Sequence, residues 1–571
     1  MTEPTFPGVF VYMLYEEFFD DDKPSMAALM AQIESLPCEP AMGGLLALSA
    51  LISNIEEPFR SDVQQQIVAE IGQRTSYVHS LIDFLRAHVD RVLVSEEQIG
   101  VLIRLCIQHR DLMVGKIEDL GDRLLRAMLL WNSLAVAETT TAIEQDAPEA
   151  KDERFVKLEI RSVLHDAENI RDVLGRYSEF MLWSRSEEGH TENYIDLDAA
   201  FNRFYDVSYD EWIAAALAFL SYYGSFRTMH DIRSRPLAPK YEALTGGLLE
   251  SAVLDKFAKE AIIGEVALRK AFEQVPGTLS GAGLAPLLQQ PLMKLQNGGI
   301  ACPYIPHLRN KMGTGVYFAL MDGFRREGGG AAVERFTRYF GQFFESYVFQ
   351  IFRRSYKAGG ATVYPEQTYL PGIKSTDVVI FDGSSAIFIE VVAKRFNFVK
   401  SVLGLEDAAI QRDIENMIIE KAEQLSRNIA DFYSGSLRYD GVTPENIAKV
   451  FPVVCTITPV PQFIGVNGAV ANRIAEMGLL STSESLQLMC AEDCEILEPF
   501  FTRSGSLSEI FSQKLSHDLS RRISLKNFLL YSRPDAVSSA AQSVAGQNQL
   551  ARSKAVAAKW YRDAGGENVV Q

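Results

Sequence analysis

Residues 377–393 constrain the fold of this chain more than any other stretch. Two arms rich in β-branched residues, 377–381 and 386–393, flank Asp-Gly-Ser-Ser, whose residue types favour a tight turn. We therefore predict a β-hairpin here. Antiparallel pairing would bring Asp377, at the start of the first arm, close to Glu390, near the end of the second. Two carboxylates held in this way offer the hard oxygen ligands that suit Mg²⁺ or Mn²⁺.

The segments around the hairpin predict an α/β domain with a sheet flanked by helices. Residues 341–352 carry apolar side chains at helical spacing, and Glu345 lies one step from that apolar stripe. Strands and helices alternate from there onward, as they do in α/β sheets. In chain order we predict a helix at 341–352, a strand at 361–364, the hairpin, a long helix at 412–433, and strands at 450–458 and 486–490.

This order of elements, with acids at Glu345, Asp377 and Glu390, resembles the PD-(D/E)XK nuclease superfamily, the restriction-endonuclease-like fold. The resemblance covers residues 335–500. It implies that Asp377 and Glu390 bind Mg²⁺ or Mn²⁺, and that Glu345 is the additional acid often found on the first helix. In such enzymes the metal polarises the scissile phosphate and activates a water. The implied activity is metal-dependent cleavage of DNA phosphodiesters.

The lysine that this superfamily places two residues beyond the second acid is missing, because Val392 occupies that position. Lys394 lies on the same strand face as Glu390, but it starts about 13 Å further along at a rise of about 3.3 Å per residue. A bulge in the strand would change that distance. Lys421, on the following helix, is the leading alternative. In the superfamily that helix often contributes a Gln or Lys, which also makes Gln424 a candidate.

Each candidate also has a purely structural explanation. Asp377 can be a solvated residue at a strand end, Glu345 a surface acid, and Lys394 and Lys421 ordinary basic residues. Glu390 is harder to explain in this way, because it interrupts an apolar run where an unpaired carboxylate loses its hydration. The alternative function is a catalytically inactive scaffold of the nuclease fold that binds nucleic acid or a protein partner. The valine in the lysine position favours that alternative.

Composition and the remaining motifs exclude several classes of protein. A formal net charge of −18 argues against a protein that coats nucleic acid, since the phosphates would be repelled. Lys and Arg nevertheless outnumber Asp and Glu by eight to five within residues 338–400, as a phosphate-facing groove requires. The cysteines form no CxxC pair, and Gly328-Gly329-Gly330 lacks the lysine of a phosphate-binding loop and predicts a flexible link. Without a long apolar run, we expect a cytoplasmic protein with no membrane segment.

We predict two main parts and a tail. Residues 1–290 show helical spacing almost throughout, which predicts an all-helical region that recognises a partner, forms a homo-oligomer or restrains the nuclease. Residues 291–533 would form the nuclease-like α/β domain, opening with a hairpin at Asn297-Gly298. Residues 534–571 predict a loose tail with a short helix at 550–561. By analogy, a large regulatory region on a nuclease is typical of bacterial antiphage defence.

Overall fold

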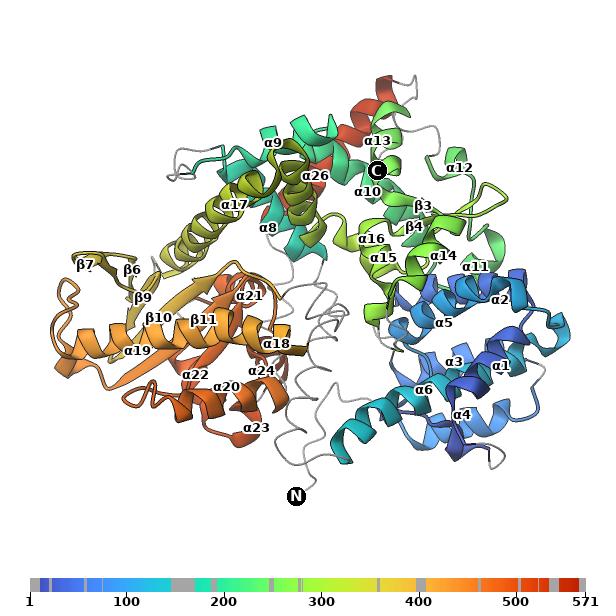
Figure 1. Ribbon diagram of the computed structural model, residues 1–571, viewed down its shortest axis with the longest axis horizontal. Helices are drawn as coiled ribbons and strands as arrows, with labels where there is room; N and C mark the ends of the chain where they lie inside the picture. The colour runs from blue at the N-terminus through green and yellow to red at the C-terminus, as the bar shows by residue number, and fades with distance from the viewer. Residues whose placement is uncertain are drawn as a thin grey trace. The chain divides into compact units, whose positions relative to one another are not determined.

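Contacts divide the chain into two units. Figure 1 shows the chain coloured by residue number, so each unit contains several colours. The helical unit comprises Met1–Gln145, Tyr205–Val316 and Leu550–Gln571, and the α/β unit comprises Asp146–Phe204 and Tyr317–Gln549. The computed structural model describes residues 11–19, 23–55, 59–73, 75–144, 170–185, 193–245, 251–275, 279, 281–356, 360–396, 407–460, 464–501, 505–521, 523–532 and 544–563.

The α/β unit is built on a mixed sheet, which is five-stranded within the described residues. Its strand order is β12-β11-β10-β9-β6. The pairs β6–β9 and β9–β10 are antiparallel, whereas β10–β11 and β11–β12 are parallel. This arrangement confirms the predicted combination of a helical region and an α/β part. The strands are β6 (Thr362–Pro365), β9 (Val378–Asp382), β10 (Ser385–Val392), β11 (Lys449–Thr456) and β12 (Gln487–Cys490).

The predicted hairpin is confirmed as the pair β9–β10. Asp382 faces Ser385 across a two-residue turn in which Gly383 has a φ of 61°, a backbone conformation that glycine adopts without steric cost. The pairing runs on to Ile389 opposite Val378. One step further in the same register, Asp377 stands opposite Glu390.

One face of the sheet is covered by the long helical segment that follows β10, with α20 (Ile464–Glu476) beside it. The predicted helix at 412–433 is present and starts earlier. It consists of α18 (Asp407–Ile414), a π-helical turn (Glu415–Ile419) and α19 (Glu420–Tyr433). Leu425, Ile429 and Phe432 of α19 share an apolar core with Phe388 of β10. Burial of this amphipathic face holds α19 on the sheet.

The opposite face of the sheet is covered by α21 (Ala491–Phe501) and α22 (Leu507–Leu515). Side chains alternate along β11, so that those not facing α19 meet these two helices. Phe451 contacts Phe511 of α22 at 5.7 Å between ring centroids. Cys455 of β11 and Cys494 of α21 are both buried, and their sulfur atoms are 3.7 Å apart. Both are free thiols.

Helix α17 (Thr314–Ser355) leads into the sheet and contains the predicted helix at 341–352. Its glycines do not form a separate link as predicted. Gly328 and Gly329 instead kink the helix, and Gly329 has a φ of 62°. The second half of α17 packs against α8 (Ile170–Trp183), where Phe180 contacts the Tyr347 ring at 4.9 Å between centroids.

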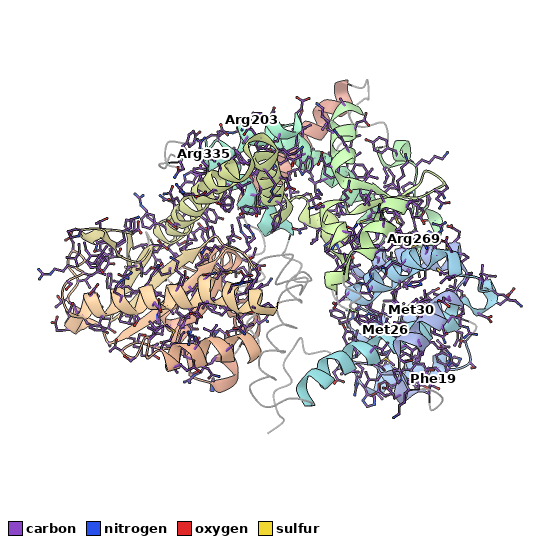
Figure 2. All side chains as sticks on the ribbon, viewed as in Figure 1. Phe19, Met26, Met30, Arg203, Arg269 and Arg335 are labelled. Atoms are coloured by element: carbon purple, nitrogen blue, oxygen red, sulfur yellow. The ribbon has the colours of Figure 1, made fainter. Side chains whose placement is uncertain are left out.

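Polar contacts also tie the segment before residue 205 to the α/β unit. Arg176 of α8 donates to both carboxylate oxygens of Glu495 on α21, at 2.7 and 2.9 Å, and the Tyr347 hydroxyl donates to the same carboxylate at 2.9 Å. Helix α9 (Leu197–Tyr205) follows, and Arg203 forms an ion pair with Glu327 of α17. Figure 2 labels Arg203 together with Arg335, which donates to the Tyr194 carbonyl.

The largest part of the helical unit, from α1 to α6, shares an apolar core that includes Leu102, Leu125 and Trp131. The two short strands β1 (Val11–Tyr12) and β2 (Arg91–Val92) interrupt the predicted run of helices. Its helices are α1 (Met26–Glu34), α2 (Cys38–Ile52), α3 (Ser61–Ile71), α4 (Val78–Ala87), α5 (Glu96–Gln108), α6 (Leu120–Glu144), α10 (Tyr209–Tyr223), α11 (Met229–Ser234), α12 (Tyr241–Thr245), α13 (Ser251–Ala261), α14 (Glu265–Glu273), α15 (Pro286–Gln289), α16 (Ile305–Asn310) and most of α26 (Val544–Asp563).

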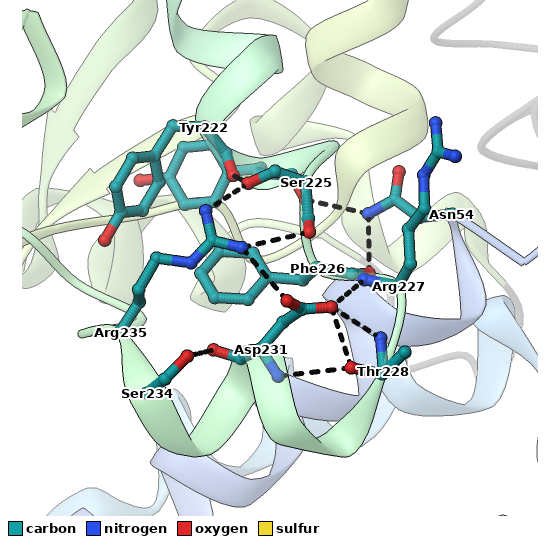
Figure 3. A network of polar contacts seen from close by, with 10 residues as sticks. Asn54, Tyr222, Ser225, Phe226, Arg227, Thr228, Asp231, Ser234 and Arg235 are labelled. Carbon is teal, nitrogen blue, oxygen red and sulfur yellow. Dashed lines mark hydrogen bonds and ion pairs between the residues drawn. The ribbon is translucent and has the colours of Figure 1, made fainter.

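A polar network fixes the connection between α10 and α11 to the end of α2 (Figure 3). The Asn54 amide donates to the carbonyl oxygens of Tyr223, at 2.7 Å, and Phe226, at 3.4 Å. Thr228 caps α11 in a reciprocal box with Asp231. Arg235 lies over the Phe226 ring at 5.0 Å. These contacts satisfy backbone groups that the two helix ends would otherwise leave without partners.

The unit boundaries differ from those predicted at residues 290 and 533. The predicted hairpin at Asn297-Gly298 is present as β4 (Leu292–Lys294) and β5 (Ile300–Ala301), but β4 also pairs with β3 (Ile262–Gly264). The hairpin therefore belongs to the helical unit. The tail helix α26 is longer than the predicted 550–561, and residues 534–543 and 564–571 of the predicted loose tail lie outside the described residues.

Replacing Arg176 with methionine should lower the free energy of unfolding of the α/β unit by about 3 kcal/mol, because it removes the buried guanidinium that donates to both oxygens of the Glu495 carboxylate. The side chain of Arg176 is 1% exposed and that of Glu495 is 9% exposed. Arg338→Met is the control, since the Arg338 side chain is 59% exposed and its pair with Glu334 contributes little. Urea unfolding followed by tryptophan fluorescence measures the difference, and equal stability of the two variants would contradict the assigned role of Arg176.

Candidate active site

A cavity of about 410 Å³ opens where the Asp377–Glu390 end of the hairpin meets α17 and α19. It brings together most of the side chains that the sequence singles out. Glu345 reaches it from α17, Asp377 and Glu390 from the hairpin, and Lys421 and Gln424 from α19. Lys394 is absent from its lining.

The two hairpin acids are held differently. The Asp377 carboxylate accepts a hydrogen bond of 2.7 Å from the Val391 backbone N–H, which fixes it across the two strands. Glu390 is 3% exposed and occupies the α19-facing side of β10, in line with the buried residues Phe388 and Val392. A glutamate in an apolar stripe requires a partner, because burial without one costs several kcal/mol (~3 or more).

Lys421 is that partner. Its ammonium donates to Glu390 Oε2 and to Gln424 Oε1, both at 2.8 Å. Burial alone would lower the pKa of Lys421, but the negative charges of Glu390 and Asp377 outweigh burial and raise the pKa instead. Lys421 therefore carries its positive charge at neutral pH.

When ionised, the carboxylates of Glu345, Asp377 and Glu390 together carry more negative charge than the single ammonium of Lys421 can neutralise. Burial, reinforced by the charge of Asp377, raises the pKa of Glu345 and that of Glu390 to about 8. Burial also raises the pKa of Asp377, to about 6, although Lys421 opposes that shift. Such a cluster takes up protons or a cation near neutral pH.

The donor set is suited to a hard divalent cation. Carboxylate oxygens are the ligands that Mg²⁺ and Mn²⁺ prefer. Gln342, one helical turn before Glu345, adds an amide oxygen that is buried without a hydrogen-bond partner among the described residues. No group of three or more His, Cys, Asp or Glu side chains in the described part of the chain is already arranged as a ligand set. The fit is therefore one of donor chemistry.

Of the two lysines proposed for the site, the structure brings only Lys421 to the acids. Strand β10 ends at Val392, and Lys394 is exposed beyond that end. Val392 is buried in the apolar core beneath α19. The ammonium expected on the strand is thus supplied by the neighbouring helix, which packs over the same end of the sheet.

The cavity has further polar residues that the sequence analysis did not select. Glu366 and Lys374 form an ion pair of 2.7 Å on the outer side. Lys374 belongs to a small hairpin of β7 (Thr368–Leu370) and β8 (Ile373–Lys374), whose turn contains Gly372 with a φ of 74°. The Pro371-Gly372 pair is a turn signal that could have identified this hairpin.

Asn428 joins the small hairpin to α19. With its amide oriented to suit its neighbours, it donates to the Lys374 carbonyl at 3.3 Å and accepts from the Thr376 N–H at 3.1 Å. These contacts fix the backbone directly before Asp377. The positions 421, 424 and 428 follow the spacing of one helix face, so Asn428 was recognisable from the helical pattern that includes Lys421 and Gln424.

Comparisons with protein-family models, with curated proteins and with solved structures found no match. Among the described helices, none combines the length and the apolar composition that crossing a bilayer requires. A functional interpretation of this chain therefore depends on the chemistry of its own residues.

The metal-free protein should lose stability as the pH rises from about 5 to about 8. In the folded chain the pKa of Glu345 is about 8, against an ordinary value of 4.5. The folded state therefore binds protons more tightly than the unfolded chain, and the stability from this group is present at low pH and lost as the pH rises through that window.

Glu345→Gln should flatten this pH dependence by about 1 kcal/mol or more between the two ends of the window, because it removes one titrating group. Urea unfolding in EDTA across the pH range measures the slope. Glu334→Gln, at a side chain that is 71% exposed, is the control and should leave the slope unchanged. Parallel curves for the wild type and Glu345→Gln would contradict the assigned proton uptake.

Proposed function

We propose that the α/β unit is a divalent-metal-dependent hydrolase of DNA phosphodiesters. The observation that carries this proposal is the convergence of Glu345, Asp377, Glu390 and Lys421 on one cavity. Buried acids with raised pKa values beside a charged lysine are typical of catalytic sites. Their order along the chain and their places on helix, hairpin and following helix are those implied by the resemblance to the PD-(D/E)XK superfamily.

Asp377 and Glu390, with Glu345, are the residues that would hold Mg²⁺ or Mn²⁺. Such an ion, when bound, supplies positive charge beside a phosphate oxygen and makes a water more acidic. Asp377 is positioned for this role by its bond from the Val391 N–H, which leaves its second oxygen available. Burial of Glu390 keeps its carboxylate in one orientation.

Lys421 would stabilise the negative charge that develops on the phosphate during hydrolysis. Its contact with Gln424 orients the ammonium toward the cavity, and its raised pKa keeps it charged. A fixed, partly buried cation acts more strongly there than it would in water. The helical unit would then recognise a partner or restrain the hydrolase.

A scaffold without hydrolysis is the second candidate. Two observations favour it: the buried Val392 in the position that a lysine takes in the superfamily, and the lack, among the described residues, of a ready-made ligand set of three acids. In that case the Glu390–Lys421 pair would serve only to satisfy a buried carboxylate. The two candidates differ in one measurable property, which is cleavage that depends on a divalent ion.

Supercoiled plasmid and linear DNA incubated with the full chain and Mg²⁺ or Mn²⁺ should be nicked or cut, and EDTA should stop the reaction. Asp377→Asn and Glu390→Gln should each lower the rate by about 10²-fold or more, since each removes an acid proposed to hold the ion. Agarose gels and fluorescence-labelled oligonucleotides give the rates. Cleavage that survives both substitutions would remove this site assignment, and no cleavage by the wild type would favour the scaffold.

Substitutions of Lys421 and Lys394 should have very different effects on the cleavage rate in the same assay. Lys421→Met should lower the cleavage rate by about 10²- to 10³-fold, the effect of removing one group that stabilises charge in a transition state. Lys394→Met is the matched control and should retain the wild-type rate, because Lys394 is exposed and lies outside the cavity lining. The reverse result would return the catalytic role to Lys394.

A further inference from the structure

Three cations line the cavity, and two of them already have partners. Lys421 pairs with Glu390, and Lys374 pairs with Glu366. Arg427 of α19 is exposed at the cavity lining, and its guanidinium forms no ion pair or hydrogen bond with any residue that the structure describes. An arginine in this position is available to a ligand.

Arg427 lies at a distance from the reacting centre. It follows Lys421 by six positions on the same helix, which corresponds to about 9 Å along the axis at about 1.5 Å per residue. Successive phosphates of one DNA strand are about 3.4 Å apart along the duplex axis. A phosphate contacted by Arg427 would therefore be a neighbour of the one at Lys421 rather than that phosphate itself.

The net charge of the lining does not itself favour a second phosphate, so a phosphate there needs a specific cation. The lining carries four acids, Glu345, Glu366, Asp377 and Glu390, against three cations. Of the three cations in the lining, Lys374 and Lys421 have ion-pair partners, and Arg427 has none among the described residues. Arginine also suits phosphate geometry, because its planar fork donates two parallel hydrogen bonds.

We propose that Arg427 binds a phosphate adjacent to the reacting one, so that the cavity selects nucleic-acid strands over isolated phosphodiesters. This inference rests on the proposed function, because it assigns the substrate class of the same site. A strand offers the neighbouring phosphate that Arg427 needs. A small diester with a single phosphate does not.

A DNA-binding assay tests the proposed role of Arg427 separately from hydrolysis. A fluorescently labelled single-stranded oligonucleotide and its duplex are titrated with full-length Asp377→Asn protein at several KCl concentrations in the presence of Mg²⁺. Adding Arg427→Gln should weaken binding by about three- to tenfold, the range for an exposed charge-assisted contact. It should also reduce the slope of log affinity against log salt by about 1, because one phosphate contact is lost.

Arg473→Gln is the matched control, since Arg473 is an exposed arginine of α20 outside the cavity lining. It should change neither the affinity nor the salt slope. Arg427→Lys should recover part of the affinity, because it keeps the charge and loses the fork.

The outcomes distinguish this inference from the function on which it rests. Equal affinities and salt slopes for Arg427→Gln and Arg473→Gln, in a protein that binds the strand, would overturn the role of Arg427 alone. No binding of either nucleic acid by the parent protein would overturn both proposals. In the wild-type background, Arg427→Gln should raise KM for oligonucleotides at unchanged kcat, and leave the hydrolysis of bis(p-nitrophenyl) phosphate unaltered. An equal loss on both substrates would also contradict the inference.

Discussion

The ion pair between Glu390 and Lys421 is the interaction on which the candidate site depends. It places a carboxylate inside an apolar layer, between β10 and the helix that covers it, and it supplies the compensating charge from that same helix. A pair of this kind contributes little net stability compared with apolar residues of the same size. Its presence in an otherwise apolar interface therefore supports the proposed role of the site rather than a role in folding alone.

The sheet explains why this pair lies next to the other acids. An antiparallel hairpin places Asp377 opposite Glu390, and the parallel strand β11 beyond it requires a crossover, which here is the helical segment that ends in α19. The π-helical turn at Glu415–Ile419 comes directly before α19 and is separated from Lys421 by Glu420 alone. Because such a turn shifts the register of the residues that follow it, it helps determine which face of α19 is presented to the acids.

The parts of the site that could be predicted are those set by local sequence. The hairpin was predictable because its β-branched arms and its Gly383 turn are contiguous, and the pairing rule then brought two acids together. The choice between Lys394 and Lys421 was not predictable, since it depended on where β10 ends and how α19 packs.

Glu366 and Arg427 were missed because nothing in their immediate neighbours distinguishes them from solvated surface charges. The true unit boundaries were also hidden, because α8 is held by contacts such as Arg176 to Glu495, which are 319 positions apart.

That long separation has a consequence for how the chain is made. Helix α8 leaves the ribosome well before α17 and α21, the two helices against which it packs, and the whole of residues 205–316 is synthesised in between. Phe180 and Arg176 therefore lack their contacts with α17 and α21 until those two helices have been synthesised. A fragment that begins at residue 317 would keep the sheet and its acids, yet it would lack the helix that buries Tyr347 and the Glu495 carboxylate.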